Sequence, residues 1–367
     1  MPDPLLFRPF ELRGLETRNR LWISPMCQYS CPSEGPETGV PGDWHLQHIG
    51  ALARGGAGLV MVEATGVVPE GRISPNCPGL WNDAQERAFA RLVGVAHAHG
   101  ARIGIQLGHA GRKGSVHPML PSSPDASVPA SEGGWATVAP SAIAFGGLAA
   151  PHALGTEGIA GVRDAFLAAA DRAVRAGFDA VELHAAHGYL LHEFLSPFSN
   201  ERDDRYGGGP ENRARLLREI ARGIRAAHPG LPLLVRISAT EWTPGGFDLD
   251  AATQVAGWLS EDGVDLVDVS SAANLPGVRV PVGPSYQVAL AARVRTAGLP
   301  VGAVGLITSA EQAEGILASG QADVVFIGRA ALENPHLPIA WAHRLGAPTA
   351  RELVPGPYFR ARFGGGA

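Results

Sequence analysis

The sequence contains little cysteine and almost no lysine. Its three cysteines, Cys27, Cys31 and Cys77, are an odd set, which fits reduced thiols in a cytoplasm better than a disulfide framework. Lys113 is the single lysine among the 30 basic residues, and we attribute this bias to genomic base composition. The formal net charge is −5 and no long basic run occurs, which argues against nucleic acid as the main partner.

Long hydrophobic runs are also missing. No apolar stretch approaches the roughly 18 residues of a transmembrane helix. The start of the chain, Met1 to Arg8, lacks the uninterrupted apolar segment of a signal peptide. We therefore expect a cytoplasmic protein without a membrane partner. With 367 residues and 45% of them hydrophobic, the chain can bury a large core without disulfide or metal support.

Short apolar runs recur, each followed by a turn and then by a helical pattern. Their continuous apolarity, rich in β-branched residues, indicates strands covered on both faces, as in a parallel sheet. There are eight runs: Leu21 to Ser24, Gly58 to Ala64, Arg102 to Leu107, Ala180 to His184, Leu233 to Ser238, Leu266 to Ser270, Pro300 to Val304 and Val324 to Gly328.

The segments between the runs carry helical periodicity, for example over 162–177, 212–227, 250–261 and 309–319. Eight strands alternating with helices in one chain predict a (β/α)₈ TIM barrel, a single domain spanning residues 1–367. The competing doubly wound sheet usually has a glycine fingerprint after its first strand, and that signal is missing here.

Details of this prediction concern the helix ends. Gly177 is expected at a helix C-cap, and Asp250 and Ser309 are expected N-caps. Residues 117–147 lack periodicity and are rich in Pro, Ser, Gly and Ala, so we expect an excursion over the barrel mouth at about 115–147. The tail, at about 354–367, ends in three glycines and is expected to fray at its very end.

Active sites of such barrels lie at the C-terminal ends of the strands, so the polar residues there are the candidate site. They are Cys27 and Tyr29, Glu63, Gln106 and His109, His184 and His187, Arg236, Ser270 and Arg329. If His184 and His187 bound a metal ion, the site would need a third ligand such as His192 or Glu182. Because the neighbouring strand ends bring amide, thiol and guanidinium groups, we expect no metal and interpret the pair as donors to a substrate oxygen.

A phosphate site is expected after the last two strands, where such barrels commonly bind phosphate. Gly305 and Gly328 allow a close approach of the backbone, although a glycine here is also typical of a tight turn. Arg329 beside Gly328 favours the phosphate interpretation. Together with inward-pointing Gln106 and Arg236, this pattern indicates a phosphorylated cofactor with a planar polar edge.

The chain resembles the Old Yellow Enzyme family of FMN-dependent ene-reductases, particularly its short bacterial thermophilic-like subclass, almost from end to end. The motifs are Asn19-Arg20, Ser24 to Tyr29, Gly71-Arg72-Ile73, Gly104 to Lys113, Ala139 to Ile143, His184 to Asn200, Tyr206-Gly207-Gly208, Glu211-Asn212-Arg213 and Phe326 to Arg329. This resemblance implies a non-covalent FMN at the barrel mouth. It assigns Ser24, Pro25, Met26 and Cys27 to the flavin lining, Ala64 and Gln106 to the pyrimidine edge, Arg236 to N1 and the C2 carbonyl, and Gly305, Gly328 and Arg329 to the phosphate.

The resemblance also implies the reaction. NADPH or NADH reduces FMN, and an activated alkene such as an enone, enal, maleimide or nitroalkene then accepts a hydride from flavin N5. His184 and His187 would bind the substrate oxygen as an oxyanion hole, Tyr189 would supply the proton, and Tyr29 would close the pocket. Cys27 would tune the flavin rather than act as a nucleophile.

The same resemblance implies a homodimer, or a tetramer of such dimers, with shared active sites. Arg360, or as second choice Arg362, would enter the neighbour's pocket. The segment 117–137 resembles an insertion in xenobiotic reductases of the subclass, and Gly209 stands where the family commonly has serine. A four-cysteine cluster motif is missing, which excludes the iron–sulfur relatives.

Three alternatives compete with this interpretation. A metal-dependent barrel hydrolase would use His184 and His187. An FMN barrel that modifies RNA is disfavoured by the net charge of −5. A non-catalytic phosphate-binding barrel would leave Tyr189 and Cys27 unexplained. The physiological substrate, the choice between NADPH and NADH, and the choice between dimer and tetramer stay open at the level of sequence.

Overall fold

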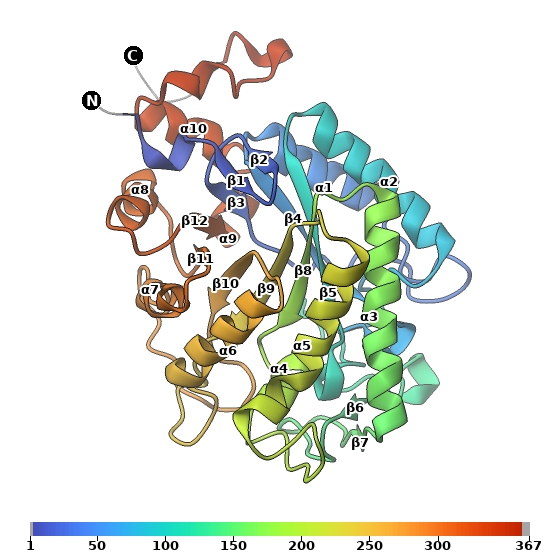
Figure 1. The fold of residues 1–367 in the computed structure, drawn as a ribbon. Coiled ribbons are helices and arrows are strands. Elements are labelled where there is room, and N and C mark those ends of the chain that lie inside the picture. The colour runs from blue at the N-terminus through green and yellow to red at the C-terminus, as the bar shows by residue number, and fades with distance from the viewer. Residues whose placement is uncertain (1–2, 362–367) are drawn as a thin grey trace.

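A computed structural model describes residues 3–361. Eight parallel strands close into one barrel in the order β10-β11-β12-β3-β4-β5-β8-β9 (Figure 1). They are β3 (Leu21–Ile23), β4 (Leu59–Gly66), β5 (Arg102–Gly108), β8 (Ala180–Ala185), β9 (Leu233–Ser238), β10 (Leu266–Ser270), β11 (Val301–Ala303) and β12 (Val324–Ile327). Each lies on one of the eight apolar runs, so the predicted (β/α)₈ fold is confirmed.

The helices lie outside the barrel; α1 to α8 come between strands along the chain, and α9 and α10 follow the last strand (Figure 1). They are α1 (Asp43–Arg54), α2 (Asp83–Ala98), α3 (Thr156–Ala176), α4 (Leu190–Leu195), α5 (Pro210–Ala227), α6 (Leu249–Glu261), α7 (Val288–Val294), α8 (Ala310–Ala318), α9 (Arg329–Glu333) and α10 (Leu337–Arg344). In residues 3–361, none of these helices combines the length and apolar character needed to cross a bilayer.

Two of the three predicted helix caps are confirmed and one is wrong. Gly177 ends α3 in the left-handed conformation, with φ 90°, and the Ser309 hydroxyl accepts a hydrogen bond from the Gln312 N–H at 3.2 Å. At α6, however, the N-cap is Asp248, which accepts from the Ala251 N–H at 2.9 Å. The helix begins earlier than predicted because Leu249 packs against the core, which leaves Asp250 inside the first turn.

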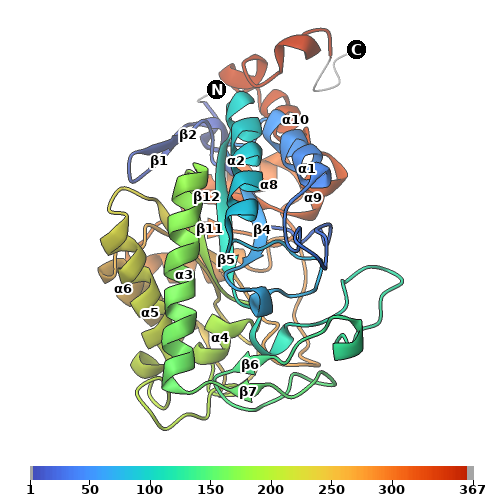
Figure 2. The same ribbon diagram turned by 90° about the vertical axis from the view of Figure 1, so that its right-hand side faces the viewer.

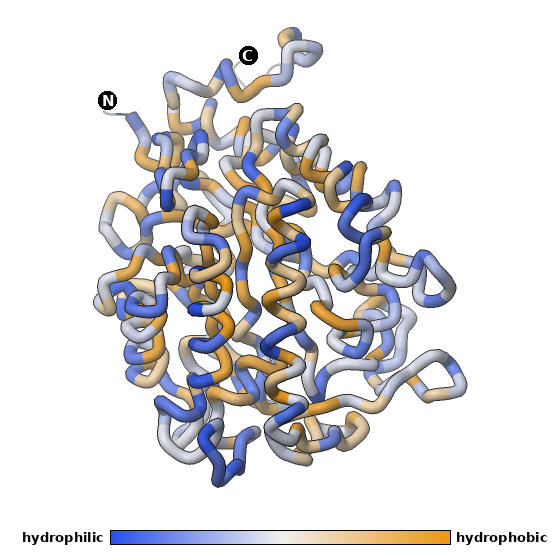
Figure 3. The backbone as a smooth tube through the Cα atoms, turned by 45° about the vertical axis from the view of Figure 1, so that its right-hand side comes forward, coloured by the Kyte–Doolittle hydropathy of each residue, from blue (hydrophilic) through white to orange (hydrophobic). Residues whose placement is uncertain are grey.

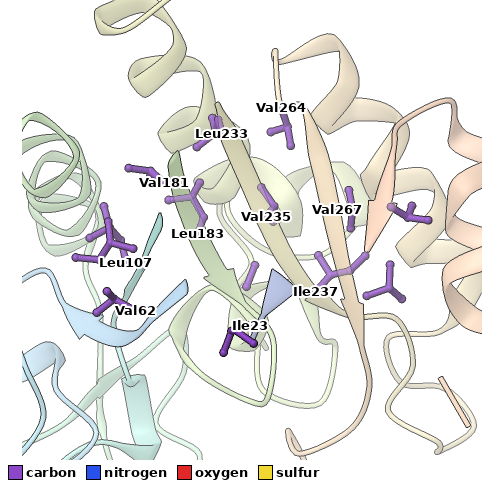
Figure 4. Close-up of a cluster of buried hydrophobic side chains, with 14 of the residues drawn as sticks. Ile23, Val62, Leu107, Val181, Leu183, Leu233, Val235, Ile237, Val264 and Val267 are labelled. Atoms are coloured by element: carbon purple, nitrogen blue, oxygen red, sulfur yellow. The ribbon is translucent and has the colours of Figure 1, made fainter. Parts of the chain in front are cut away.

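Both faces of the sheet are buried. Side chains that point outward, including Val62, Leu107, Val181 and Val235, pack under the surrounding helices (Figure 4). The inward-pointing side chains of one end form a separate apolar cluster, made of Leu12, Trp22, Leu59, Met61, Ala180, Leu234, Leu266, Val324 and Phe326. In Figure 3 hydrophilic residues recur instead along the outer helices and in the loops.

That apolar cluster fills the end of the barrel covered by a hairpin of β1 (Phe10–Leu12) and β2 (Leu15–Thr17). Trp22 packs edge-to-face on Phe326, with ring centroids 5.5 Å apart. Because the strands are parallel, the opposite end collects all their C-terminal residues. The interior there is polar, and it holds the candidate site.

The excursion between β5 and α3 lies at the site's end of the molecule, with its two short strands β6 (Val138–Ala139) and β7 (His152–Ala153) (Figures 1 and 2). Trp135 fastens it to the loop after β4: its ring stacks under Arg72 at 4.9 Å, and its indole N–H donates to the Glu70 carbonyl at 2.8 Å. The described part of the C-terminal tail lies at the other end, beyond α10 (Figures 1 and 2).

Candidate active site

Five polar side chains form a layer inside the barrel above the apolar cluster: Gln106, Glu182, His184, Arg236 and Asp268. Strand register explains why they meet. Gln106 pairs with Glu182, His184 with Arg236, and Arg236 with Asp268, and residues paired across parallel strands point to the same face. All five are buried, with at most 7% of each residue exposed. The layer is thus built by alternation along four adjacent strands.

Two contacts organise this layer. The Gln106 side-chain amide donates to Glu182 Oε1 at 2.7 Å, and Arg236 Nε lies 3.2 Å from Asp268 Oδ2. Burial raises the pKa of Glu182 to about 8, with the charge of Asp268 adding to the effect. Burial also raises the pKa of Asp268, to about 6, against the opposing influence of Arg236.

His184 and His187 lie next to each other above the layer. His184 Nδ1 faces the Ala186 N–H at 3.4 Å, so the proton of this neutral ring belongs on Nε2. His187 Nε2 lies 2.7 Å from the Ser270 hydroxyl, which is in turn placed to donate to Gln287 Oε1 at 3.3 Å, so this chain of contacts puts the His187 proton on Nε2. His184 Nε2 then donates to His187 Nδ1 across 3.5 Å. The other His187 tautomer, with Ser270 donating to Nε2, turns the Nδ1–H toward the same point as the His184 N–H.

Both histidines are held neutral. Burial, followed by the nearby Arg236 charge, lowers the pKa of His184 and of His187 well below the ordinary value. Neutral rings keep one N–H each across the physiological pH range. The pair can therefore donate two hydrogen bonds to an oxygen without a change in protonation.

The backbone at His187 is unusual, with φ 59°, a value that non-glycine residues rarely adopt. Two hydrogen bonds hold it, and a third ties the same lysine to a neighbouring loop. The His187 N–H donates to the Ser238 hydroxyl at 2.9 Å, and the Lys113 ammonium donates to the His187 and Ala273 carbonyls, both at 2.8 Å. The next residue must be glycine, because a Cβ on Gly188 would lie 2.4 Å from the Ala273 carbonyl oxygen.

Tyr189 is buried beside this pair, and its ring stands edge-on to the His184 ring with centroids 4.9 Å apart. Burial raises the pKa of Tyr189 well above its ordinary value, so the phenol stays protonated. Tyr189 and His184 line a small cavity together with Ala64, Gly108 and Ile73. The phenol of Tyr189 and one of the two histidines, His184, thus adjoin the same cavity.

Cys27 and Tyr29 lie on the loop after β3, and both pack against a small buried cluster that includes Cys77 and Tyr189. Hydrogen bonding to Cys77 and burial raise the pKa of Cys27 well above its ordinary value, so its thiol is neutral. Tyr29 has φ 51°, another strained loop position.

The start of this loop is anchored from β4. Glu63 accepts a hydrogen bond from the Gln28 N–H at 2.8 Å, and its other oxygen lies 3.3 Å from His45 Nε2. Glu63 was predicted among the strand-end residues, and here it positions the loop.

A second pocket, with a volume of about 190 Å³, opens at the ends of β11 and β12. Its lining includes Arg236, Tyr286, Gly305, Gly328 and Arg329. Gly305 has φ 121°, and a Cβ there would lie 2.9 Å from the Gln287 side chain. The residues predicted for a phosphate therefore share one cavity, and Arg236 joins it to the polar layer.

The residues predicted to hold FMN fit such a group. Ser24 Oγ is buried without a hydrogen-bond partner in the described part of the chain, which leaves a polar atom for a ligand, and the guanidinium of Arg236, whose Nε faces Asp268, lines the pocket of Arg329. The pocket that Arg329 lines is large enough for a phosphate. Cys27 and Ala64 add a neutral, compact lining.

A metal centre finds less support. Among residues 3–361, no group of three or more His, Cys, Asp or Glu side chains is arranged to hold a metal ion. The neighbours of His184 and His187 include Arg236 and Lys113, whose positive charges lower the histidine pKa values and would oppose a cation.

The structure does not gather every predicted residue at one place. Arg360 is exposed, its guanidinium stacks on Phe359 at 5.1 Å, and its segment lies at the end of the chain's fold opposite the site. Arg362 lies outside the described residues. Conversely, Asp268 and Lys113 take part in the site although no role was predicted for either from the sequence. Asp268 stands two residues before Ser270 on β10, so strand alternation could have found it.

Comparisons with known proteins agree with these features. The sequence profile of the NADH:flavin oxidoreductase / NADH oxidase family matches residues 5–346. An NADPH dehydrogenase of Geobacillus thermodenitrificans is 46% identical over 346 residues, covering 94% of this chain and 95% of that protein. An NADPH dehydrogenase of Listeria monocytogenes is 44% identical over 360 residues, with coverage of 97% and 98%.

Solved structures of related reductases also match this chain. Morphinone reductase is 31% identical with a TM-score of 0.76, covering 95% of this chain and 93% of that one. An old yellow enzyme homologue from Zymomonas mobilis is 29% identical with a TM-score of 0.77, covering 93% of each chain.

Proposed function

We propose that this chain, a member of the NADH:flavin oxidoreductase / NADH oxidase family, reduces the C=C bond of activated alkenes. The premise is that it is an Old Yellow Enzyme-type oxidoreductase, which uses FMN with NAD(P)H. The substrates are enones, enals, maleimides and nitroalkenes, whose oxygen atoms can accept two hydrogen bonds. The reaction is ping-pong, with nicotinamide and alkene using the same site in turn.

The observation that carries this proposal is the meeting of two neutral imidazoles, whose His184 Nε2 and His187 Nδ1 atoms lie 3.5 Å apart. A carbonyl or nitro oxygen that approaches both nitrogens accepts a hydrogen bond from each when the Ser270 hydroxyl donates to His187 Nε2 and the His187 proton is on Nδ1. As hydride reaches the β-carbon, negative charge grows on that oxygen, and preorganised donors stabilise it without reorganising. The alternative hydrolase is not favoured, because the family matches are to flavin oxidoreductases.

We assign the FMN contacts as follows, on the fit of the pocket residues. Ser24, Pro25, Met26, Cys27 and Ala64 line the flavin, Gln106 and Arg236 bind its pyrimidine edge, and Gly305, Gly328 and Arg329 hold the phosphate. When bound and reduced by NAD(P)H, FMN supplies the hydride. The positive charge of Arg236 favours the anionic reduced form.

Tyr189 is the proton donor to the α-carbon. Its raised pKa keeps the phenol protonated, and its contact with His184 sets it beside the substrate oxygen. Tyr29 closes the pocket from the loop after β3, where it packs against the same cluster as Tyr189. Cys27 acts as a neutral thiol against the flavin, because its raised pKa disfavours a nucleophilic thiolate.

The assembly is a homodimer, or a tetramer of dimers, in which Arg360 enters the partner's site. Support comes from the tail, which lies at the end of its own subunit opposite the site, and from its exposed aromatic residues Tyr358 and Phe359. Truncation after Gly356 should weaken the dimer in sedimentation and raise the KM for alkenes together. A truncated protein with unchanged mass and kinetics would contradict this assembly. A cytoplasmic location fits Cys27, Cys31 and Cys77, which are all free thiols.

The reaction is tested with the purified holoenzyme and a panel of acceptors: cyclohexenone, a maleimide, a nitroalkene and a nitrate ester. Each is supplied in turn with NADPH and with NADH. We expect turnover of the activated alkenes and products saturated at the C=C bond. Oxidation of the nicotinamide in air with none of the alkenes consumed would rule the proposal out.

A further inference from the structure

Two acids, Glu182 and Asp268, lie directly behind the side chains assigned to the flavin's pyrimidine edge. Neither acid has any exposed surface. Each touches a different one of the two assigned residues: Glu182 accepts from the Gln106 amide at 2.7 Å, and Asp268 lies 3.2 Å from Arg236 Nε. A buried acid so close to a cofactor-binding group changes the charge that this group presents.

The charges in this layer do not balance if both acids are ionised. Arg236 is the only cation bonded to the pair in the described chain, so two carboxylates would leave one buried negative charge uncompensated. Glu182 Oε2 and both Asp268 oxygens also have no aligned hydrogen-bond donor in residues 3–361. An unpaired buried carboxylate is costly, and protonation of one acid removes the imbalance.

The surroundings indicate which acid keeps the proton. Glu182 faces the neutral amide of Gln106 on β5 and the neutral ring of His184 on its own strand, with Arg236 on β9 and Asp268 on β10 beyond them. Asp268 is the acid at ion-pair distance from the guanidinium. Burial raises the pKa of Glu182 further than that of Asp268, to about 8 against about 6.

We propose that Glu182 and Asp268 are positioning residues with different tasks: Asp268, ionised, offsets the charge of Arg236 and thereby lowers the redox potential of the bound flavin, while Glu182, as the neutral acid, orients Gln106 without adding charge. The inference rests on the proposed FMN contacts of Gln106 and Arg236. It adds two residues that touch neither cofactor nor substrate and act through the residues that do.

The sign of the effect follows from electrostatics. Reduction places negative charge at the pyrimidine edge, so the potential rises when this edge becomes more positive. Asp268→Asn removes the negative charge behind Arg236 and should raise the potential. Glu182→Gln replaces a neutral acid by a neutral amide and should change the potential little.

The test measures the midpoint potential of the bound FMN in the two variants by equilibrium reduction against reference dyes. For D268N we expect reduced FMN to gain at least about tenfold in affinity relative to oxidised FMN, which for a two-electron couple is a rise of about 30 mV. For E182Q we expect a change below about threefold. The matched control is Glu193→Gln. Glu193 is also a buried acid whose pKa is raised to about 8, but it accepts a hydrogen bond from the Arg112 N–H and does not contact the layer. The midpoint potential of FMN bound to this variant should equal that of FMN bound to the wild type.

Wild-type protein gives a second measurement if D268N does not fold. In protein labelled with ¹³C at the glutamate carboxyl, the Glu182 signal, assigned by its loss in E182Q, should have the chemical shift of a protonated acid at pH 7, in the apoprotein as in the holoprotein. An ionised Glu182 would overturn the inference. So would a normal potential in D268N, or a larger shift in E182Q than in D268N.

The outcomes also separate this inference from the proposed function. If both variants bind FMN with a wild-type potential and reduce alkenes normally, the pair has no tuning role and the function stands. If Arg236→Lys leaves FMN affinity and potential unchanged, the assigned flavin contacts are themselves wrong, and the pair loses its premise.

Discussion

The two halves of the site are built in different ways. The half that contains Gln106, His184 and Arg236 stands on barrel strands, and its side chains meet because the strands are in register. The half that contains Tyr29 and His187 stands on loops with positive φ. Each such residue costs on the order of 1–3 kcal/mol and persists only where surrounding contacts enforce it.

This difference separates two tasks. A strand-borne group keeps its place when a neighbour changes, which suits the binding of a resident cofactor by Gln106 and Arg236. His184 is the one named member of the strand half that is assigned to the substrate, together with His187 of the loop half. A loop-borne group depends on distant contacts, such as the one from Lys113 to the Ala273 carbonyl, 160 residues away in sequence. Substitutions that act on the loop half should therefore damage alkene reduction and spare FMN, and the following experiments sharpen or break this division.

The largest effect is expected from the double variant His184→Ala, His187→Ala. Loss of one oxyanion donor typically costs about 10²–10³ in rate, so alkene reduction should fall by about 10³ or more. FMN should stay bound, because neither histidine is assigned to it, and the charge-transfer colour with a phenol should vanish. The control is wild-type enzyme with a chelator: if the chelator abolished activity, a metal role for the pair would replace the one proposed.

A smaller effect, about tenfold, is expected from Lys113→Met. The substitution removes both hydrogen bonds that hold the His187 and Ala273 carbonyls, so His187 can leave its strained conformation. Stopped-flow measurements should show slower oxidation of the flavin by alkene and unchanged FMN affinity. Arg344→Met, which removes an exposed cation paired with Glu311, is the control and should behave like wild type. Loss of FMN from K113M would mean that the two halves are not separable.

The two halves can also be compared through pH, because a buried glutamate with a raised pKa accompanies each. Burial raises the pKa of Glu182, on β8 in the strand half, and of Glu193, on α4 just after the loop of His187, to about 8. An acid whose pKa is higher in the folded than in the unfolded protein stabilises the fold at low pH. This stabilisation is lost as the pH rises from the ordinary glutamate pKa of 4.5 to the folded-state pKa of about 8.

Denaturant titrations of the apoprotein between pH 6.5 and 8 should thus show the free energy of unfolding falling with pH. Each glutamate contributes up to about 1.4 kcal/mol per pH unit. Glu193→Gln keeps the acceptor for the Arg112 N–H and should remove about half of the slope, while Glu182→Gln removes the other half. A slope unaffected by both substitutions would mean that neither acid is protonated in the folded protein.

The smallest effect is expected from Cys27→Ala, which changes neither charge nor backbone. The raised pKa keeps the Cys27 thiol neutral, so its loss should shift the flavin potential modestly, within about 1.4 kcal/mol, and leave turnover within a few-fold of wild type. Cys31→Ala, whose thiol faces His45 at 3.7 Å, is the matched control and should leave the potential unchanged. An unchanged potential in C27A would favour a simple packing role.

The strand half was predictable from sequence and the loop half was not. Apolar runs located all eight strands, and period-two alternation predicts that Gln106, His184 and Arg236 share the barrel interior. The positive φ angles at Tyr29 and His187 have no local signature, because Ser238 and Lys113 enforce one of them from other elements. The wrong N-cap at Asp250 has the same origin, since a tertiary contact of Leu249 decides where α6 begins.

Because Lys113 is the single lysine, cleavage next to it can be used to measure local unfolding of the chain. A lysine-specific protease has one cleavage point, the Lys113–Gly114 peptide bond. In the folded protein this bond lies in a tight turn, where the Lys113 N–H donates to the Ala110 carbonyl and the Gly114 N–H to the Gly111 carbonyl, both at 3.1 Å. Cleavage therefore requires this turn to open. The rate at which the two fragments appear on a gel would then report how often the chain opens locally beside the site, without a dye or label.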